Sequence, residues 1–448
     1  MSRSLMMFSA RMTMLLLAMV MALPGAAKAQ LKASIGDWPG WMGPDRTGVS
    51  QETGLLKQWP KEGPKLLWKV ADVGEGYSTP SVAGGKLFLM SNRGNNDEFA
   101  IALSVKDGSK IWERHIGKVG PNRGPQYPGS RSTPTVDGDA VYVLGSDGDL
   151  ACLDAAKGEV RWQKSIRTEF KGTPGNWAYA ESPLIDGDVL VCTPGGDTAT
   201  LAALNKKNGE VIWKAVVPGA RGGGGGGGMR GSPNSAAYAS AIVATVGGIK
   251  QYIQFIGGGL VGVAAKDGKV LWQYSGVTGM TNSTTPLFHD DCVMVSASGG
   301  GRGGGGNTSG VALVKLTADG NGGVTAKEVY HTNVLANHHG GVVRIGDAVY
   351  GTNNNALVCI DFKTGQTKWQ DRSVGKGSIA AADGRLYVRS EDGPVALVDA
   401  DPAGYKEEAR FKQPDRSGKK SWPHPVIAGG RLYLRDWNVL LCYDVKPE

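Results

Sequence analysis

One pattern of apolar and polar positions recurs along most of the chain. A short apolar stretch is followed by a polar turn, a glycine and, four residues after that glycine, a tryptophan. Alternating apolar residues, such as Leu150 and Cys152, indicate β-strands with one buried face. Complete copies run from Ala100 to Trp112, Leu150 to Trp162, Leu201 to Trp213, Leu260 to Trp272 and Leu357 to Trp369. Degenerate copies occupy 311–330 and 395–411, and a truncated copy lies at 440–444.

A second pattern precedes these copies. It is a short strand that opens with Ser/Thr-Pro and turns at Asp-Gly or Gly-Gly, as in the segment 132–138. The two patterns together predict four antiparallel strands in about 40–50 residues, the size of one propeller blade. Eight opening strands are expected, near Pro80, Pro134, Pro183, Ala241, Pro286, Val342, Ile379 and Pro425.

The two ends of this repeat complement each other. Residues 66–70 look like the closing strand of a blade that nothing precedes, and the copy at 440–444 lacks that strand. We therefore predict an all-β protein: an eight-bladed β-propeller of four-stranded antiparallel blades over residues 64–448. The N-terminal strand closes the ring by pairing with the last blade, and an N-terminal arm at 30–63 precedes it. A closed ring leaves only short, protected strand edges.

The repeated tryptophans are interpreted as packing residues that fill the wedge between neighbouring blades, each burying about 150–250 Å². A ligand-stacking role is the alternative. Cys152, Cys359 and Cys442 share one repeat position with alanine and glycine, so they are expected to be small buried residues without disulfides.

Residues 1–29 are predicted to be a secretory signal peptide. Arg3 and Arg11 precede an apolar run from Met12 to Leu23, and small residues flank Lys28. That run is short for a membrane span, so cleavage is favoured over an uncleaved anchor. No cysteine follows it that could carry a lipid. These features predict a periplasmic or secreted protein with no transmembrane segment after cleavage.

Composition narrows the possible partners. With 41% hydrophobic and 20% charged residues, the chain is not of a disordered type. The formal net charge of +8 is weak for 448 residues, which argues against a nucleic-acid partner. Two glycine tracts, Gly222–Gly228 and Gly299–Gly306, lack the Lys-Ser/Thr of a phosphate loop, so they are interpreted as flexible insertions.

The repeat resembles that of pyrroloquinoline-quinone-type (PQQ-type) β-propellers. The five complete copies carry this resemblance, and the segment 38–44 (WPGWMGP) resembles the leader of secreted PQQ-binding-like bacterial proteins. It covers residues 38–446 and implies an eight-bladed propeller. The family includes quinoprotein alcohol dehydrogenases and the BamB lipoprotein of outer-membrane barrel assembly. One fold of this kind hosts many unrelated functions.

A ring of variable residues is expected at one mouth of the propeller channel, because the residues before each first strand gather there. These positions are Tyr77, Arg131, Ala180, Tyr238, Ser283, His339, Lys376 and Trp422, with Glu181, Asn282, His338 and His424 beside them. Convergent polar groups around one concavity are the usual mark of a binding site. The alternative is an ordinary polar rim facing solvent.

The family resemblance suggests PQQ with Ca²⁺ as a possible cofactor of this ring. Arg131 and Lys376 could bind its carboxylates and Trp422 its flat face, while Glu181 and Asn282 offer oxygen ligands suited to Ca²⁺. Against this, the segment 337–340 (NHHG) stands where quinoprotein dehydrogenases use an Asp base, and neither a vicinal Cys pair nor a C-x-x-C-H motif is present.

A transition-metal site is a further hypothesis for the same mouth. His338 and His339 are adjacent and His424 is a possible third ligand. Neighbouring residues of a strand point to opposite faces, so both imidazoles could reach one ion only from a loop. No H-x-H or H-E-x-x-H spacing supports this site.

The sequence favours a binding platform over an enzyme, because no nucleophile–base pair or dense acid pair is evident, and we assign no catalytic residue. The expected partner is a small ligand or an envelope protein at the channel mouth. Two alternatives stay open. One is a PQQ-dependent alcohol or sugar dehydrogenase, and the other is a BamB-like scaffold for envelope assembly.

Overall fold

The computed structural model describes residues 36–121, 127–218, 233–279, 281–299 and 309–447. The predicted signal peptide and the greater part of both glycine tracts lie outside these residues, so the predictions for them are not tested. Residues 31–448 form one compact unit. No helix in the described ranges is long and apolar enough to cross a membrane.

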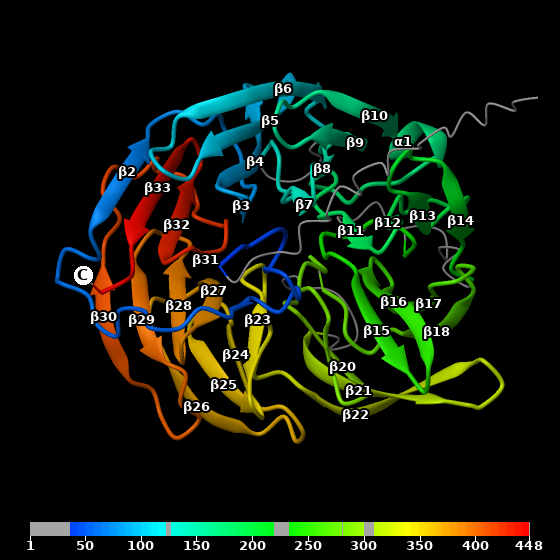
Figure 1. Cartoon of the computed structure of the whole chain (residues 1–448). Coiled ribbons are helices and arrows are strands. Elements are labelled where there is room, and N and C mark those ends of the chain that lie inside the picture. The colour runs from blue at the N-terminus through cyan, green and yellow to red at the C-terminus, as the bar shows by residue number, and fades with distance from the viewer. Residues whose placement is uncertain (1–35, 122–126, 219–232, 280, 300–308, 448) are drawn as a thin grey trace, which may run out of the picture. The chain divides into compact units, whose positions relative to one another are not determined.

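Eight antiparallel blades of four strands each follow one another around a ring, as predicted, and the seventh gains a fifth, parallel strand from the arm (Figure 1). Each sheet is one blade, and its first strand lies nearest the centre. The first four blades are formed by β3 (Ser81–Ala83), β4 (Lys86–Arg93), β5 (Asp97–Ser104) and β6 (Lys110–Lys118); β7 (Thr135–Asp137), β8 (Ala140–Leu144), β9 (Asp149–Asp154) and β10 (Val160–Ser165); β11 (Leu184–Asp186), β12 (Val189–Cys192), β13 (Leu201–Asn205) and β14 (Val211–Ala215); and β15 (Ile242–Val246), β16 (Ile249–Ile256), β17 (Gly259–Ala264) and β18 (Val270–Tyr274).

The remaining blades follow the same order until the last. They are formed by β19 (Leu287–His289), β20 (Cys292–Ala297), β21 (Gly310–Ala318) and β22 (Val324–Thr332); β23 (Val342–Ile345), β24 (Ala348–Thr352), β25 (Leu357–Asp361) and β26 (Thr367–Asp371); β27 (Gly377–Ala382), β28 (Arg385–Ser390), β29 (Val395–Asp399) and β30 (Glu407–Phe411); and β31 (Val426–Ala428), β32 (Arg431–Asp436), β33 (Val439–Asp444) and β2 (Leu66–Val70). One short helix, α1 (Ile166–Glu169), follows β10.

The ring closes where the sequence predicts. β2 pairs antiparallel with β33, with Trp68 opposite Cys442 and Val70 opposite Leu440. The last blade therefore contains both an early and a late segment of the chain. Arg435 of β32 strengthens this junction, because its guanidinium donates to the backbone oxygens of Ser78 and Met90 in the first blade.

The repeated glycine and tryptophan interlock between neighbouring blades. The indole nitrogen of Trp112 donates to the backbone oxygen of Ala155 in the next blade at 3.2 Å. Gly158, in the same turn of that next blade, leaves the room that this indole occupies. Trp68 makes the equivalent contact across the ring junction, with the oxygen of Val105 at 3.0 Å and with Gly108. This is the inter-blade packing predicted for the tryptophans.

Replacing Gly158 with alanine is expected to lower the free energy of unfolding by about 3 kcal/mol, because two effects add. Gly158 has a φ of +69°, and a Cβ there would lie 2.6 Å from the Trp112 ring. Gly138→Ala is the matched control in the same blade, since Gly138 has a φ of +60° and no neighbour within 4 Å of a Cβ. We expect the control to lose only about 1 kcal/mol in urea denaturation. Equal losses would contradict the interlocking.

All five cysteines are free, and all but Cys292 are buried. Cys152, Cys359 and Cys442 are at most 1% exposed, in agreement with the small buried position predicted for them.

The described residues of the N-terminal arm, 36–63, cross the centre of the ring (Figure 1) and contact each of the eight blades. Trp38 forms an isolated antiparallel bridge with Val82 of the first blade. β1 (Val49–Ser50) pairs parallel with β27 of the seventh blade. The other contacts are Val136 N–Pro39 O, Arg46 with the oxygens of Ser182, Pro183 and Ala241, Trp41 with Thr285, Gly48 against Val343, and Glu52 with Gly430 N. The arm therefore packs across the channel rather than extending away from it.

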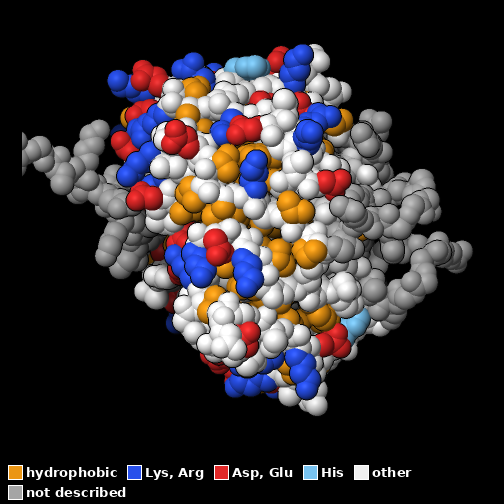
Figure 2. Space-filling model, turned by 90° about the vertical axis from the view of Figure 1, so that its right-hand side faces the viewer, with side chains coloured by type: hydrophobic (Ala, Val, Ile, Leu, Met, Phe, Trp, Pro, Cys, Tyr) orange, Lys and Arg blue, Asp and Glu red, His pale blue; other side chains and the backbone are white. Residues whose placement is uncertain are grey.

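The outer strands leave apolar side chains in contact with solvent. Figure 2 shows apolar side chains spread across one side of the ring among charged groups. On β14, the outermost strand of the third blade, Val211 is 37% and Ile212 50% exposed, and Val216 follows with 48%. An apolar strand at a sheet edge is a surface to which another chain can add.

Candidate functional site

All eight residues that the sequence places before the first strands line one cavity at the channel mouth. The cavity has a volume of about 300 Å³. The arm supplies one lining residue, Trp41, whose indole nitrogen donates to Thr285 Oγ1 at 2.7 Å. The other lining residues are Thr79, Tyr127, Trp177, Ser240, Thr281, His338, Glu391, Lys420 and His424.

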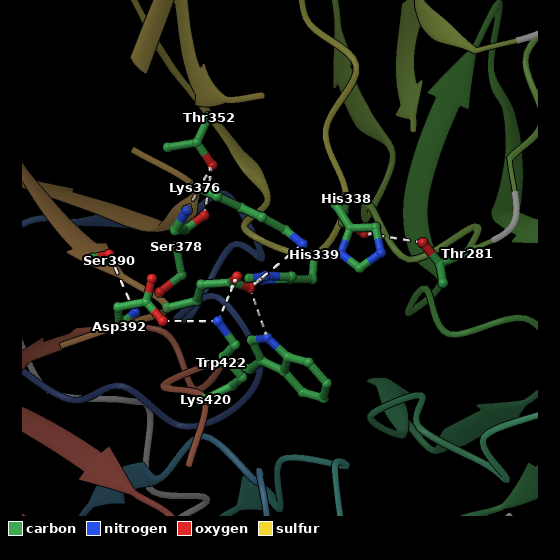
Figure 3. Close-up of polar contacts among 12 residues, drawn as sticks. Thr281, His338, His339, Thr352, Lys376, Ser378, Ser390, Asp392, Lys420 and Trp422 are labelled. Atoms are coloured by element: carbon green, nitrogen blue, oxygen red, sulfur yellow. Dashed lines mark hydrogen bonds and ion pairs between the residues drawn. The ribbon is translucent and has the colours of Figure 1, made fainter. Parts of the chain in front are cut away.

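Glu391 organises the polar side of the cavity. It follows β28, and its carboxylate accepts from Lys420 Nζ at 3.0 Å and from Trp422 Nε1 at 3.2 Å. His339 Nε2 lies 3.2 Å from the same carboxylate and Lys376 Nζ lies 3.4 Å from it. Four side chains from three loops thus converge on one carboxylate, as Figure 3 shows for the labelled donors.

These contacts fix the charge of Glu391. Burial raises its pKa, but the hydrogen bonds from His339 and Lys420 and the charge of Lys376 outweigh burial and hold the pKa well below its usual range. Glu391 is therefore an anion at physiological pH, and its carboxylate is already bound by the four neighbouring side chains.

The three histidines of the cavity are neutral at physiological pH. Burial, together with the electrostatic effects of the neighbouring His339 ring and of the Lys376 charge, lowers the pKa of His338 to about 3. Burial also lowers the pKa of His339, and it lowers that of His424 to about 4. His424 donates from Nε2 to the backbone oxygen of His339 at 3.2 Å.

Replacing His424 with glutamine is expected to remove part of the acid sensitivity of the fold. The folded pKa lies below the unfolded value of about 6.5, so His424 contributes stability above pH 6.5 that is lost as pH falls towards 4. The stability difference between wild type and His424→Gln should therefore shift by about 3 kcal/mol against wild type from pH 7 to pH 4. Urea denaturation at both pH values measures this, and a constant difference would contradict it.

Aromatic rings form another part of the cavity lining. The ring of Trp422 lies 4.7 Å, between centroids, from both Tyr77 and Tyr127. Trp177 and Tyr238 form a second pair, 5.7 Å apart. The cavity thus combines aromatic walls with a basic corner formed by Lys376 and Lys420.

Arg131 lines the cavity, but its hydrogen bonds are directed at the backbone. Its guanidinium donates to the carbonyl oxygens of Gly129 at 3.1 Å and Trp177 at 3.0 Å, and to that of Tyr127. It also lies 5.6 Å above the Tyr77 ring. Arg131 therefore holds the aromatic loops in place, and its positive charge has carbonyl dipoles as its partners.

Glu181 and Asn282, the expected calcium ligands, do not line this cavity. Glu181 is 3% exposed, and its carboxylate accepts from the backbone N–H of Thr193 and from Gln254 Nε2. The amide oxygen of Asn282 accepts from Gly279 N at 2.8 Å. Because these oxygens already bind protein donors, the pair does not fit a calcium-bound quinone in the cavity.

His338, His339 and His424 all line the cavity, but they are not arranged as a set of metal ligands. The rings of His338 and His339 lie 5.2 Å apart between centroids. Within the described ranges, no group of three or more His, Cys, Asp or Glu side chains could hold a metal ion. Their metal-binding role stays a prediction.

Sequence reasoning missed Glu391, Lys420 and the arm residue Trp41. A signal for Glu391 exists, because the turn after the second strand reads Ser-Asp-Gly at 146–148 but Ser-Glu-Asp-Gly at 390–393. This extra acidic residue in one blade departs from the repeat at the mouth of the channel.

Comparison with known proteins supports both the fold and a family. A sequence profile described as outer membrane protein assembly factor BamB (PQQ_2) matches residues 28–176 and 128–371. Outer membrane protein assembly factor BamB of Yersinia pestis is 24% identical over 394 residues, covering 83% of this chain and 86% of that protein.

Two solved structures share the fold. BamB from Moraxella catarrhalis has a TM-score of 0.56 at 15% identity and covers 85% of this chain and 99% of that one. Quinohemoprotein alcohol dehydrogenase from Comamonas testosteroni has a TM-score of 0.60 at 12% identity and covers 93% and 82%. At such identities the likeness establishes architecture and leaves the chemistry open.

Proposed function

Because this chain belongs to the PQQ-repeat family described as outer membrane protein assembly factor BamB, we propose that it is an envelope scaffold for the assembly of outer-membrane proteins. The observation that carries this proposal is the match of the family profile over residues 28–371. A named assembly factor is also similar along most of its own length.

The surface of the ring supports a scaffold role. A scaffold needs an exposed surface where a partner can add, and β14 with Val211 and Ile212 offers an apolar edge strand of that kind. The predicted signal peptide would deliver the chain to the periplasm, where such assembly takes place.

Complementation tests this function. The full chain is expressed in a Gram-negative strain that lacks its own BamB, and the amount of folded outer-membrane protein is measured beside an empty vector. We expect the chain to restore a substantial share of that amount. No restoration, with the chain folded and exported, would contradict the proposal.

A cavity variant provides the matched control. Thr281→Val changes the channel mouth and leaves the outer strands untouched, so it should complement as well as the wild type. Complementation that depends on Thr281 would place the assembly function at the mouth and would contradict a role of the outer surface.

A further inference from the structure

The cavity carries chemistry that a scaffold does not require. Its walls combine aromatic rings, basic groups and neutral imidazoles at one end of the ring. The residues that face it differ from blade to blade, whereas the packing residues repeat. A volume of about 300 Å³ is at the lower end for binding pockets, so it suits a ligand of one or two rings.

The charges that line the cavity are unequal. Among the described lining residues, Arg131, Lys376 and Lys420 are cationic, and Glu391 is the only carboxylate. Asp392 offsets one further charge, because its carboxylate lies 2.8 Å from Lys420 Nζ, although its side chain is 72% exposed. Among the described lining side chains and Asp392, cations therefore exceed carboxylates by one. This excess is the charge of Arg131, which the nearby buried Glu98 partly offsets, so the lining suits a ligand of low negative charge.

The positions of Lys376 and Lys420 favour a small anion as the ligand. Lys376 and Lys420 lie side by side on Glu391, at 3.4 and 3.0 Å, and their side chains are 24% and 36% exposed. Both can donate to a second anion. A phosphate is less suited, because the fork of Arg131 is already directed at backbone oxygens. The basic corner thus fits a single carboxylate.

The aromatic side chains of the cavity favour a ligand that carries a flat ring. Trp422 is held on one edge by its hydrogen bond to Glu391 and is flanked by Tyr77 and Tyr127. Figure 3 shows the indole of Trp422 and the imidazole of His338 pointing toward the same open space. A ring between them would lie next to the lysines, and stacking of this kind contributes about 0.5–1.5 kcal/mol beyond burial.

We infer that this cavity binds a small aromatic monocarboxylate, with its ring against Trp422 and its carboxylate at Lys376 and Lys420. The ligand is either a free aromatic acid or the C-terminal aromatic residue of a polypeptide, since the two present the same groups. This inference goes beyond the scaffold function and does not depend on it.

Isothermal titration calorimetry of the full-length purified protein with benzoate tests the inference. We expect saturable binding with a dissociation constant of about 1 mM or lower. Benzyl alcohol, which lacks the charge, and cyclohexanecarboxylate, which lacks the aromatic ring, should each bind at least about tenfold more weakly. Equal binding of either analogue, or no saturable binding of benzoate, would overturn the inference.

Two variants locate the site. Lys376→Met and Trp422→Leu should each weaken benzoate binding at least about tenfold. Their controls are Lys207→Met, at a lysine 71% exposed on the third blade, and Trp369→Phe on β26, which should bind as the wild type does. Thermal melts confirm that each variant is folded. If Trp422→Leu does not fold, Lys376→Met decides the result alone.

Two further ligands distinguish a free aromatic acid from a polypeptide C-terminus and test PQQ as the rival ligand. Tighter binding of N-acetylphenylalanine than of benzoate indicates a polypeptide C-terminus, and the reverse order indicates a free acid. Calcium-dependent binding of PQQ at least about tenfold tighter than either would overturn the monocarboxylate assignment. Complementation is scored in cells, so failure of one proposal is distinguishable from failure of the other.

Discussion

Replacing Arg435 with methionine is expected to lower the free energy of unfolding by about 5 kcal/mol or more, because several buried oxygens would lose their donor at once. Arg435 is fully buried in β32, and burial lowers its pKa only to about 9, so it stays charged at physiological pH. Its hydrogen-bond acceptors are the backbone oxygens of Gly74, Glu75, Ser78, Met90 and Trp437, and Ser91 Oγ.

The location of these acceptors explains the size of the effect. All but Trp437 O belong to the segment 74–91, which leads into and forms the first blade, whereas Arg435 belongs to the last. The substitution therefore weakens the junction between the two ends of the chain. Methionine fills a similar volume but donates nothing.

Urea denaturation measures the loss. Arg435→Lys keeps the charge with fewer donors and should lose about 3 kcal/mol. Arg161→Met, at an exposed arginine paired with Asp139 and Asp154, is the control and should lose less than about 1 kcal/mol. A loss at Arg435 as small as that of the control would contradict a buried junction.

Replacing Arg46 with alanine is expected to lower the free energy of unfolding by about 3 kcal/mol. The arm inserts this side chain between two blades, where it donates to the oxygens of Ala241 at 2.9 Å, Ser182 at 3.2 Å and Pro183. Burial lowers its pKa to about 10, which leaves the guanidinium charged at physiological pH. The residues that carry these oxygens directly precede β11 and β15, the inner strands of the third and fourth blades.

Hydrogen exchange distinguishes this effect from a general loss. In Arg46→Ala, hydrogen exchange should rise first at β11 and β15, because the residues just before these strands lose their hydrogen bonds to the arginine. β27, which pairs with β1, should stay protected. Denaturation gives the magnitude, with Arg161→Met again as control. A uniform rise around the ring would contradict a local role of Arg46.

The sequence predicts the architecture because its determinants repeat. A glycine in one blade accommodates the tryptophan of the preceding blade, so the Gly-x-x-x-Trp spacing records contacts between blades as well as within them. The same repetition predicts the closing strand, since β2 is a strand of this kind without a blade before it. All eight positions that it places before the first strands line one cavity.

The direction of single side chains is harder to predict from the repeat. Ala180 and Ser283 line the cavity, while their neighbours Glu181 and Asn282 turn into the protein and bind its backbone. Adjacent residues of an extended chain point to opposite sides, which accounts for both cases. His338 and His339 both face the cavity because they lie in a loop.

The locations of Glu391 and Trp41 in the cavity depend on long-range structure. Glu391 lies in a turn after a second strand, and its partners Lys376, Lys420 and Trp422 come from other loops. Trp41 reaches the cavity only because the arm crosses the ring. The extra acidic residue in its turn singles out Glu391, but neither its partners nor the location of Trp41 follow from a local pattern.

The closed ring is the claim on which the cavity depends, and the distance between the two ends of the folded chain tests it most directly. Spin labels at Lys65→Cys and Lys446→Cys, both exposed, are measured by pulsed electron resonance in a Cys292→Ser background. Asp444 N donates to Lys65 O at 2.8 Å, so the labelled Cα atoms should lie roughly 10 Å apart. Eight sheets stacked in an open row would separate them by about 70 Å, and a distance of that order would contradict the account.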